Sequence, residues 1–170
     1  MTLYIIIGMV VVIAVIVFIV LNNYNKLKDL NNSLIAGEEM LLKTLNTKKD
    51  LLNKVKETSK NKELIKAMNF ESNLNIFELE KTLFEVKWNL NKLINEKKYT
   101  PKKDVISTLD AINKTEEEIE GLKDYYNSKA ITYNEFYYKK PFTTLYKLLK
   151  LEQKKTFSLR KIEDYEILKY

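Results

Sequence analysis

LYIIIGMVVVIAVIVFIVL, residues 3–21, is a stretch of nineteen residues without a charge in a chain of 170. At ~1.5 Å per residue, a helix of this length covers about 28 Å, close to the ~30 Å hydrocarbon core of a bilayer. The stretch therefore predicts a transmembrane helix over residues 3–21, with residues 1–2 as a short extracytoplasmic N-terminus.

Two other interpretations of this stretch fit less well. A cleaved signal peptide has a basic start, an apolar run of roughly 7–15 residues and a site of small residues. Met1 and Thr2 carry no basic side chain, the run is longer, and Asn22-Asn23-Tyr24 follows it. A core helix that is apolar all round would be hard to surround with protein in a chain this small. A membrane anchor is favoured over both.

The positive charges that flank the stretch predict its orientation. None precedes it, whereas Lys26 and Lys28 follow closely, and Lys43, Lys48 and Lys49 come next. Lys and Arg near a membrane-spanning segment tend to stay in the cytoplasm. We expect a single-pass protein of the cell membrane with its N-terminus outside and its body in the cytoplasm.

Composition predicts an all-α body. The chain has only three Gly and two Pro, so breaks in helices should be few.

The net charge of +6 is carried by lysine, and Arg160 is the only arginine. This argues against nucleic acid as a partner, because arginine supplies the bidentate contacts to guanine and phosphate.

A heptad-like pattern predicts that the membrane helix continues to about Thr58. The positions of this seam are spaced three or four residues apart, with one step of seven, as in helices that pack on other helices. They are Leu27, Leu30, Leu34, Gly37, Leu41, Lys48, Leu51 and Val55. Gly37 would allow a close approach, whereas a buried Lys48 needs a partner or must extend its ammonium to water.

Two further long helices are expected, over residues 62–98 and 104–139. The first can be broken near 69–73, with Ser72 or Asn73 as N-cap. A fourth helix would start at Pro141. We expect an antiparallel four-helix bundle over residues 22–157, followed by a C-terminal tail over 158–170.

The helix over 104–139 repeats a Tyr-Asn pair after seven residues, which places both pairs on one face. Packing is the favoured role for these tyrosines. Glu116 and Lys123 interrupt the same face, and we expect Glu116 to meet a lysine or a backbone-bound water.

These residues resemble the LemA family in two blocks. The first follows the membrane helix and includes Tyr24, Asn25, Leu27, Lys48, Asp50 and Leu51. The second includes Thr115, Glu116, Lys123, Tyr126, Asn127, Tyr133, Asn134 and Pro141. The family usually has Trp in place of Glu38 and Pro in place of Asn53, so the chain resembles a divergent member.

The resemblance implies a membrane-anchored helical bundle on the inner side of a bacterial membrane. It implies no established biochemical activity. It also implies a role in envelope or membrane-stress maintenance, with membrane proteases or envelope proteins as partners.

Two basic surfaces are candidate contact sites. If the helix over 62–98 returns toward the bilayer, the turn after it would face lipid through Lys97, Lys98, Lys102 and Lys103, and each would contribute about 1 kcal/mol. Beyond Pro141, a basic amphipathic helix would face a protein partner through Lys147, Lys150, Lys154 and Lys155. Alternatively, both surfaces are only solvated.

Catalysis is not expected. The chain has no His and no Cys, and its glycines at positions 8, 37 and 121 cannot form a phosphate-binding loop. We expect no cofactor or metal, and interpret the carboxylates around Glu116 as a solvated face. The function predicted is an interaction or scaffold module; the alternative is a lipid-engaging or membrane-shaping protein that acts through its basic surfaces.

Overall fold

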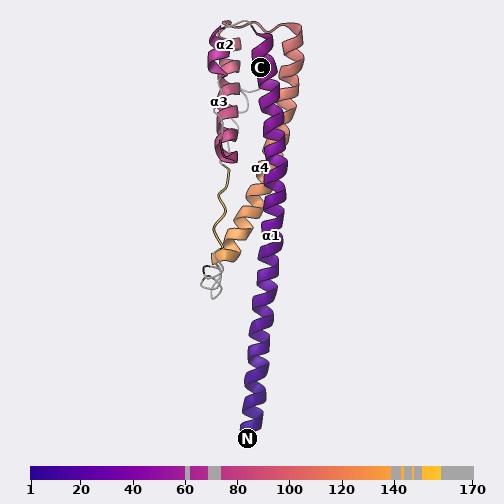
Figure 1. Cartoon of the computed structure of the whole chain (residues 1–170), viewed down its shortest axis with the longest axis vertical. Helices are drawn as coiled ribbons and strands as arrows, with labels where there is room; N and C mark the ends of the chain where they lie inside the picture. The colour runs from indigo at the N-terminus through magenta and orange to yellow at the C-terminus, as the bar shows by residue number, and fades with distance from the viewer. Residues whose placement is uncertain (60–61, 69–73, 139–142, 144–146, 148–150, 158–170) are drawn as a thin grey trace. The chain divides into compact units, whose positions relative to one another are not determined.

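A computed structural model describes residues 1–59, 62–68, 74–138, 143, 147 and 151–157. It contains α1 (Thr2–Thr58), α2 (Lys62–Ala67), α3 (Ile76–Asn95) and α4 (Lys103–Tyr138), shown in Figure 1. Within these residues there is no β-strand. The all-α prediction is confirmed, as are the continuation of the first helix to Thr58 and, within one residue at each end, the helix predicted over 104–139.

The chain forms two compact units. Unit 1 consists of Met1–Ala36 and Tyr126–Thr156, and unit 2 consists of Gly37–Tyr125 and Phe157–Tyr170. Helices α1 and α4 therefore each contribute residues to both units. The two units are described separately below.

In unit 1, the first part of α1 is the apolar stretch. Its large side chains are exposed from Leu3 to Ile19, and so is Leu21. Among the described residues, α1 is the one helix long and apolar enough to cross a membrane. The core of unit 1 is formed by side chains spaced three, four or seven residues apart, as expected for packed helices. They are Leu27 and Leu34 of α1 and Tyr126, Ala130, Tyr133 and Tyr137 of α4.

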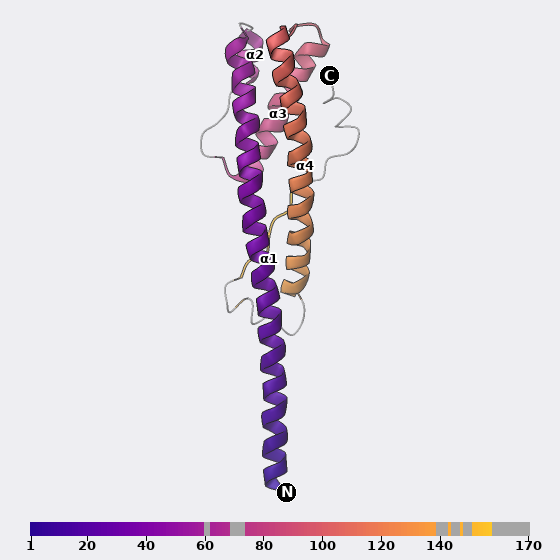
Figure 2. The same cartoon turned by 90° about the vertical axis from the view of Figure 1, so that its right-hand side faces the viewer.

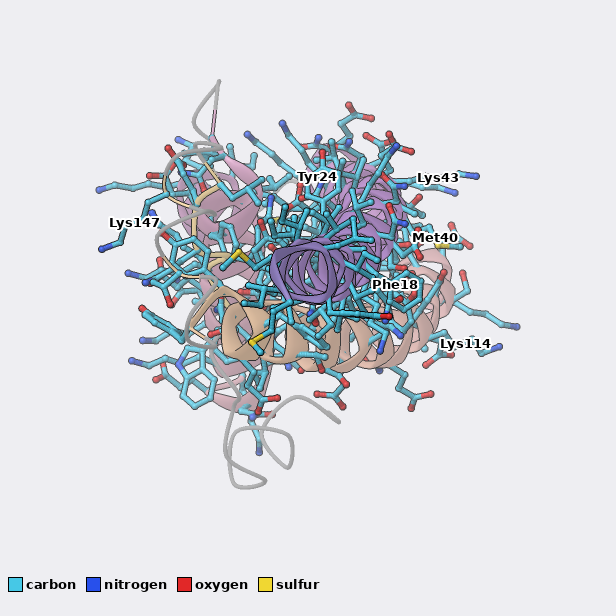
Figure 3. All side chains as sticks on the ribbon, turned by 90° about the horizontal axis from the view of Figure 1, so that it is seen from below. Phe18, Tyr24, Met40, Lys43, Lys114 and Lys147 are labelled. Atoms are coloured by element: carbon cyan, nitrogen blue, oxygen red, sulfur yellow. The ribbon has the colours of Figure 1, made fainter. Side chains whose placement is uncertain are left out.

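In unit 2, α1, α3 and α4 lie side by side (Figures 1 and 2). Their buried apolar side chains recur every three or four residues, and Met40, Lys43 and Lys114 point away from this core (Figure 3). The buried apolar side chains are Leu41, Leu45, Leu52, Val55, Leu64, Met68, Leu79, Leu83, Val86, Leu90, Val105, Ile112, Ile119 and Phe157. Gly37 and Lys48 of the predicted seam are also buried, whereas Leu30 and Leu51 are half-buried.

Contacts between side chains give the directions of α1 and α4 in unit 2. The Thr44 hydroxyl donates to Glu118 Oε1 over 3.4 Å, and one turn later in α1, Lys48 pairs with Glu116. Residue numbers therefore rise along α1 as they fall along α4. These segments run in opposite directions.

Side-chain contacts also show that α3 runs antiparallel to α4. Glu80 contacts Lys123, and Lys87 contacts Asn113. Because α1 and α3 both oppose α4, they point the same way. The expectation that the segment 62–98 returns against the first helix is therefore wrong for α3.

The interruption between α2 and α3 makes this direction of α3 possible. Asn75 is the N-cap at which α3 begins. Its Oδ1 accepts hydrogen bonds from the backbone N–H groups of Phe77 and Glu78 over 3.0 and 3.1 Å. Glu78 Oε2 accepts one from the Asn75 N–H over 3.1 Å, which completes a capping box. The sequence left open a break near 69–73, and the structure has one, because α2 ends at Ala67 and α3 begins at Ile76. The candidate caps Ser72 and Asn73 lie outside the described residues, and the observed cap is Asn75.

The C-terminal end differs from the predicted fourth helix. Residues 151–157 have no regular secondary structure. The prediction of a helix that reaches residue 157 is wrong over this segment. Pro141, Lys150 and the predicted tail over 158–170 lie outside the described residues.

Candidate functional site

An ion pair lies inside unit 2. The Lys48 ammonium contacts Glu116 Oε2, and the two side chains are 2% and 6% exposed. The expectation that Glu116 meets a lysine is confirmed, and Lys48 is buried with a partner rather than extended to water. Loss of hydration is costly for both ions, so each stabilises the fold only while the other is present.

A second buried lysine holds two carboxylates. Lys123 Nζ lies 3.0 Å from Glu80 Oε1 on α3 and 3.0 Å from Glu120 Oε1 one turn earlier on α4. Lys123 and Glu80 are buried and Glu120 is half-buried. This triad ties α3 to α4 electrostatically.

Lys87 is the third buried lysine of unit 2. Its ammonium donates a 2.6 Å hydrogen bond to Asn113 Oδ1, and Asn91, one turn further along α3, is also buried. The three lysines and the three glutamates named above balance in charge. We call these residues the ionic layer: Lys48, Glu80, Lys87, Asn113, Glu116, Glu120 and Lys123.

The ionic layer is suited to fixing how helices pair. Its glutamates contact ammonium groups, and the described residues contain no group of three or more side chains that could hold a metal ion. Glu116 is buried, as expected from its place on the packed face of the helix predicted over 104–139, whereas its neighbours Glu117 and Glu118 are exposed, as expected for a solvated face. A charged pair that must meet inside a core disfavours other registers of the helices.

The other positions of the resemblance divide between core and surface. Thr115 is buried and donates a 2.8 Å hydrogen bond to the Ala111 carbonyl. Leu27, Tyr126 and Asn127 are also buried. Tyr24, Asn25 and Asp50 are exposed and Leu51 is half-buried.

In unit 1, the second Tyr-Asn pair holds the C-terminal segment. The Lys154 backbone N–H donates to Asn134 Oδ1, and Asn134 Nδ2 donates to the Lys154 carbonyl, both over 2.9 Å. Lys154 Nζ lies 5.6 Å from the centroid of the Tyr133 ring, and Gln153 Nε2 donates to the Tyr138 hydroxyl. We call Tyr133, Asn134 and Tyr138 the α4 clamp.

The α4 clamp is not predicted from the sequence, because two Tyr-Asn pairs seven residues apart indicate packing on one helix face. Tyr133 and Tyr137 are indeed buried. Burial raises the pKa of the Tyr133 hydroxyl, and the electrostatic interaction with Tyr137 raises it further by a smaller amount. Asn134 differs from the buried Asn127 in being only half-buried. Its position at the edge of the core leaves its amide free to reach another segment.

A hollow of about 510 Å³ adjoins the α4 clamp in unit 1. It is lined by Ile131, Asn134, Glu135 and Tyr138. Ile131 and Tyr138 remain 53% and 57% exposed. Apolar surface is therefore available next to the residues that hold Lys154.

The candidate lipid-facing lysines Lys97, Lys98, Lys102 and Lys103 are all exposed. Lys98 pairs with Glu96 over 2.7 Å, and this hydrogen bond lowers the pKa of the Glu96 carboxyl. Their turn lies at the end of unit 2 where α1 finishes at Thr58, because α3 runs in the same direction as α1. The returning helix on which the predicted lipid contact of these lysines depended is therefore not observed in unit 2.

The candidate partner-facing lysines are not equivalent. Lys147 and Lys155 are exposed, and Lys150 lies outside the described residues. Lys154 is half-buried, with its ammonium over Tyr133. Lys154 thus belongs to an internal contact of unit 1.

No family model, no curated protein and no solved structure matches this chain.

Proposed function

We propose that this chain is a non-enzymatic, membrane-anchored helical-bundle protein that serves as an interaction or scaffold module. The observation that carries the proposal is the composition of α1. This single helix contains the exposed apolar stretch at its start and Lys48 of the ionic layer near its end. An apolar segment that no protein covers is suited to lipid, and the rest of the helix is built into a folded body.

The proposal extends to the cytoplasmic face of a bacterial cell membrane. Lys26 and Lys28 follow the apolar stretch on α1 and are exposed. Basic residues at this position favour the cytoplasmic side. The N-terminus would then be outside.

Membership of the LemA family, as a divergent member whose body is a helical bundle, is part of the same proposal. Residues of the second block of the resemblance pack in both units, with Glu116 and Lys123 in the ionic layer and Tyr126 in the core of unit 1. The partners that the resemblance implies are membrane proteases and envelope proteins. Envelope or membrane-stress maintenance is the corresponding role.

Topology is tested by labelling single cysteines, since the natural chain has none. We expect a membrane-impermeant maleimide to label Thr2→Cys in intact spheroplasts and to label Lys114→Cys, an exposed position on α4, only after permeabilisation. The reverse pattern would place the body outside and overturn the proposed location.

The scaffold role is tested by affinity purification of the full-length protein in mild detergent. The control carries residues 1–36 fused to an unrelated soluble domain, so that both samples share the anchor. We expect one protein at stoichiometric yield with the full chain and none with the control. Recovery of phospholipid alone would overturn the scaffold role in favour of a lipid-engaging or membrane-shaping protein.

A further inference from the structure

The α4 clamp forms hydrogen bonds with a peptide backbone. Asn134 uses both its amide donor and its amide acceptor on a single residue, Lys154. Two residues of neighbouring antiparallel strands exchange the same pair of hydrogen bonds. The side chain of Asn134 therefore stands in for one residue of a β-strand, and it can hold any residue that has a backbone N–H.

Two further contacts add preference for side chains. The ammonium of Lys154 lies over the Tyr133 ring, an arrangement that stabilises a cation at this position. The Gln153 amide donates to the Tyr138 hydroxyl. A basic residue preceded by a polar one fits the α4 clamp best.

The surface next to the clamp is not covered by the described part of the chain. Ile131 and Tyr138 are more than half exposed, and together with Glu135 they line the adjoining hollow. A peptide longer than residues 153–154 could place an apolar side chain on Ile131. Glu135 would favour a peptide with positive charge.

We propose that the α4 clamp is a binding site for an extended basic peptide of a partner protein, and that Gln153 and Lys154 occupy it as an internal competitor. This inference rests on the proposed scaffold function and gives that function a site. A tethered segment has an effective concentration of the order of millimolar, so it competes strongly with a peptide in solution. The partner binds when this segment leaves the clamp.

The test uses the full-length chain in detergent and a fluorescent peptide with the sequence of residues 151–156, LEQKKT. Lys154→Pro removes the N–H that binds Asn134, so the internal segment is released. We expect this variant to bind the peptide at least about tenfold more tightly than the natural chain, because the natural site is largely occupied. Lys155→Pro is the matched control, and we expect it to behave as the natural chain.

Changes to Asn134 and to the peptide show whether the α4 clamp binds the peptide backbone. Adding Asn134→Leu to the Lys154→Pro chain should abolish peptide binding, and Asn134→Asp, which keeps the acceptor and loses the donor, should weaken it. A peptide N-methylated at the residue equivalent to Lys154 should not bind, whereas methylation at the residue equivalent to Lys155 should be tolerated. Far-UV circular dichroism confirms that each variant keeps its helices.

Equal peptide binding by the natural chain and the Lys154→Pro chain would overturn the proposal, as would binding that survives Asn134→Leu. Recovery of the same partner with natural and Asn134→Leu chains would also count against the clamp, while the scaffold function would stand. Peptide binding without any recovered partner would support the clamp and count against the scaffold function. The two ideas therefore fail separately.

Discussion

Lys48 on α1 forms an ion pair with Glu116 on α4, and both side chains are almost fully buried in unit 2. The pair joins positions that are far apart in the sequence. In the sequence, each residue interrupts an apolar face of its helix. The structure shows that the two interruptions face each other.

Replacing one partner of this ion pair should destabilise the fold much more than replacing both partners together. We expect Lys48→Met or Glu116→Leu alone to lower the free energy of unfolding by about 3–5 kcal/mol, because each leaves a buried charge without its partner. The double variant should lie near the natural chain or be more stable by about 1–4 kcal/mol. Urea unfolding followed by circular dichroism in detergent measures all three.

The matched control for this cycle is the pair Lys81 and Glu85 on α3, whose side chains are 76% and 59% exposed. Water solvates both charges, so Lys81→Met should cost less than about 0.5 kcal/mol. Similar costs for Lys48→Met and Lys81→Met would contradict the prediction that Lys48→Met leaves Glu116 as a buried charge without its partner.

The direction of α3 predicts an order of distances. Spin labels on exposed Glu57 and Lys98 should lie closer together than labels on Lys43 and Lys98, by up to about 20 Å, because fourteen residues of α1 separate Lys43 from Glu57. Pulsed electron paramagnetic resonance on spin-labelled double-cysteine variants measures both distances. If the helix over 62–98 returned along α1 instead, the order would be reversed.

Asn75 should stabilise the start of α3. Asn75→Ala removes the acceptor for the N–H groups of Phe77 and Glu78 and should cost about 1 kcal/mol. Asn89→Ala is the control, because this exposed residue lies inside α3, where alanine favours the helix. A cost for Asn89→Ala as large as that for Asn75→Ala would contradict the assigned cap.

Tyr133 should make the fold sensitive to alkali. Burial raises the pKa of its hydroxyl above the ordinary 10.0, so the folded state holds this proton more tightly than the unfolded state. The protonated Tyr133 hydroxyl makes its full contribution to the free energy of unfolding below about pH 10. This contribution is lost as the pH rises through the higher pKa of the folded state. The natural chain should lose more stability between pH 9 and pH 11 than Tyr133→Phe does.

Tyr125→Phe serves as the control for this comparison, since Tyr125 is exposed on the same helix. The other ionisable groups are the same in the natural chain and in each variant, so the difference between variants isolates the tyrosine. Equal losses in the natural chain and in Tyr133→Phe would show that the Tyr133 hydroxyl does not carry the effect.

Much of the helical structure could be predicted from the sequence. Nineteen uncharged residues, few glycines and a three-four spacing identify α1, its end at Thr58 and the limits of α4 within a residue. The same spacing identified Tyr126 and Tyr133 as packed side chains. These features depend on neighbours within a few turns, which is the range that periodicity describes.

The candidate sites were predictable only in part. A buried Glu116 needs a cation, so its need for a partner follows from physical chemistry, but several lysines could have met it. The turn lysines Lys97 and Lys98 were assigned to lipid because helix 62–98 was given the wrong direction. A hydrophobic pattern is the same whichever way the helix runs.

By itself, the sequence determined an all-helical chain with an uncovered apolar stretch at the start of α1, because hydropathy and helix spacing are local properties. Only the tertiary structure decided that α3 runs with α1, that Lys48 pairs with Glu116, and that Asn134 holds the backbone of Lys154. Each of these joins residues distant along the chain. Packing and desolvation choose among such contacts, and they act only once the helices have come together.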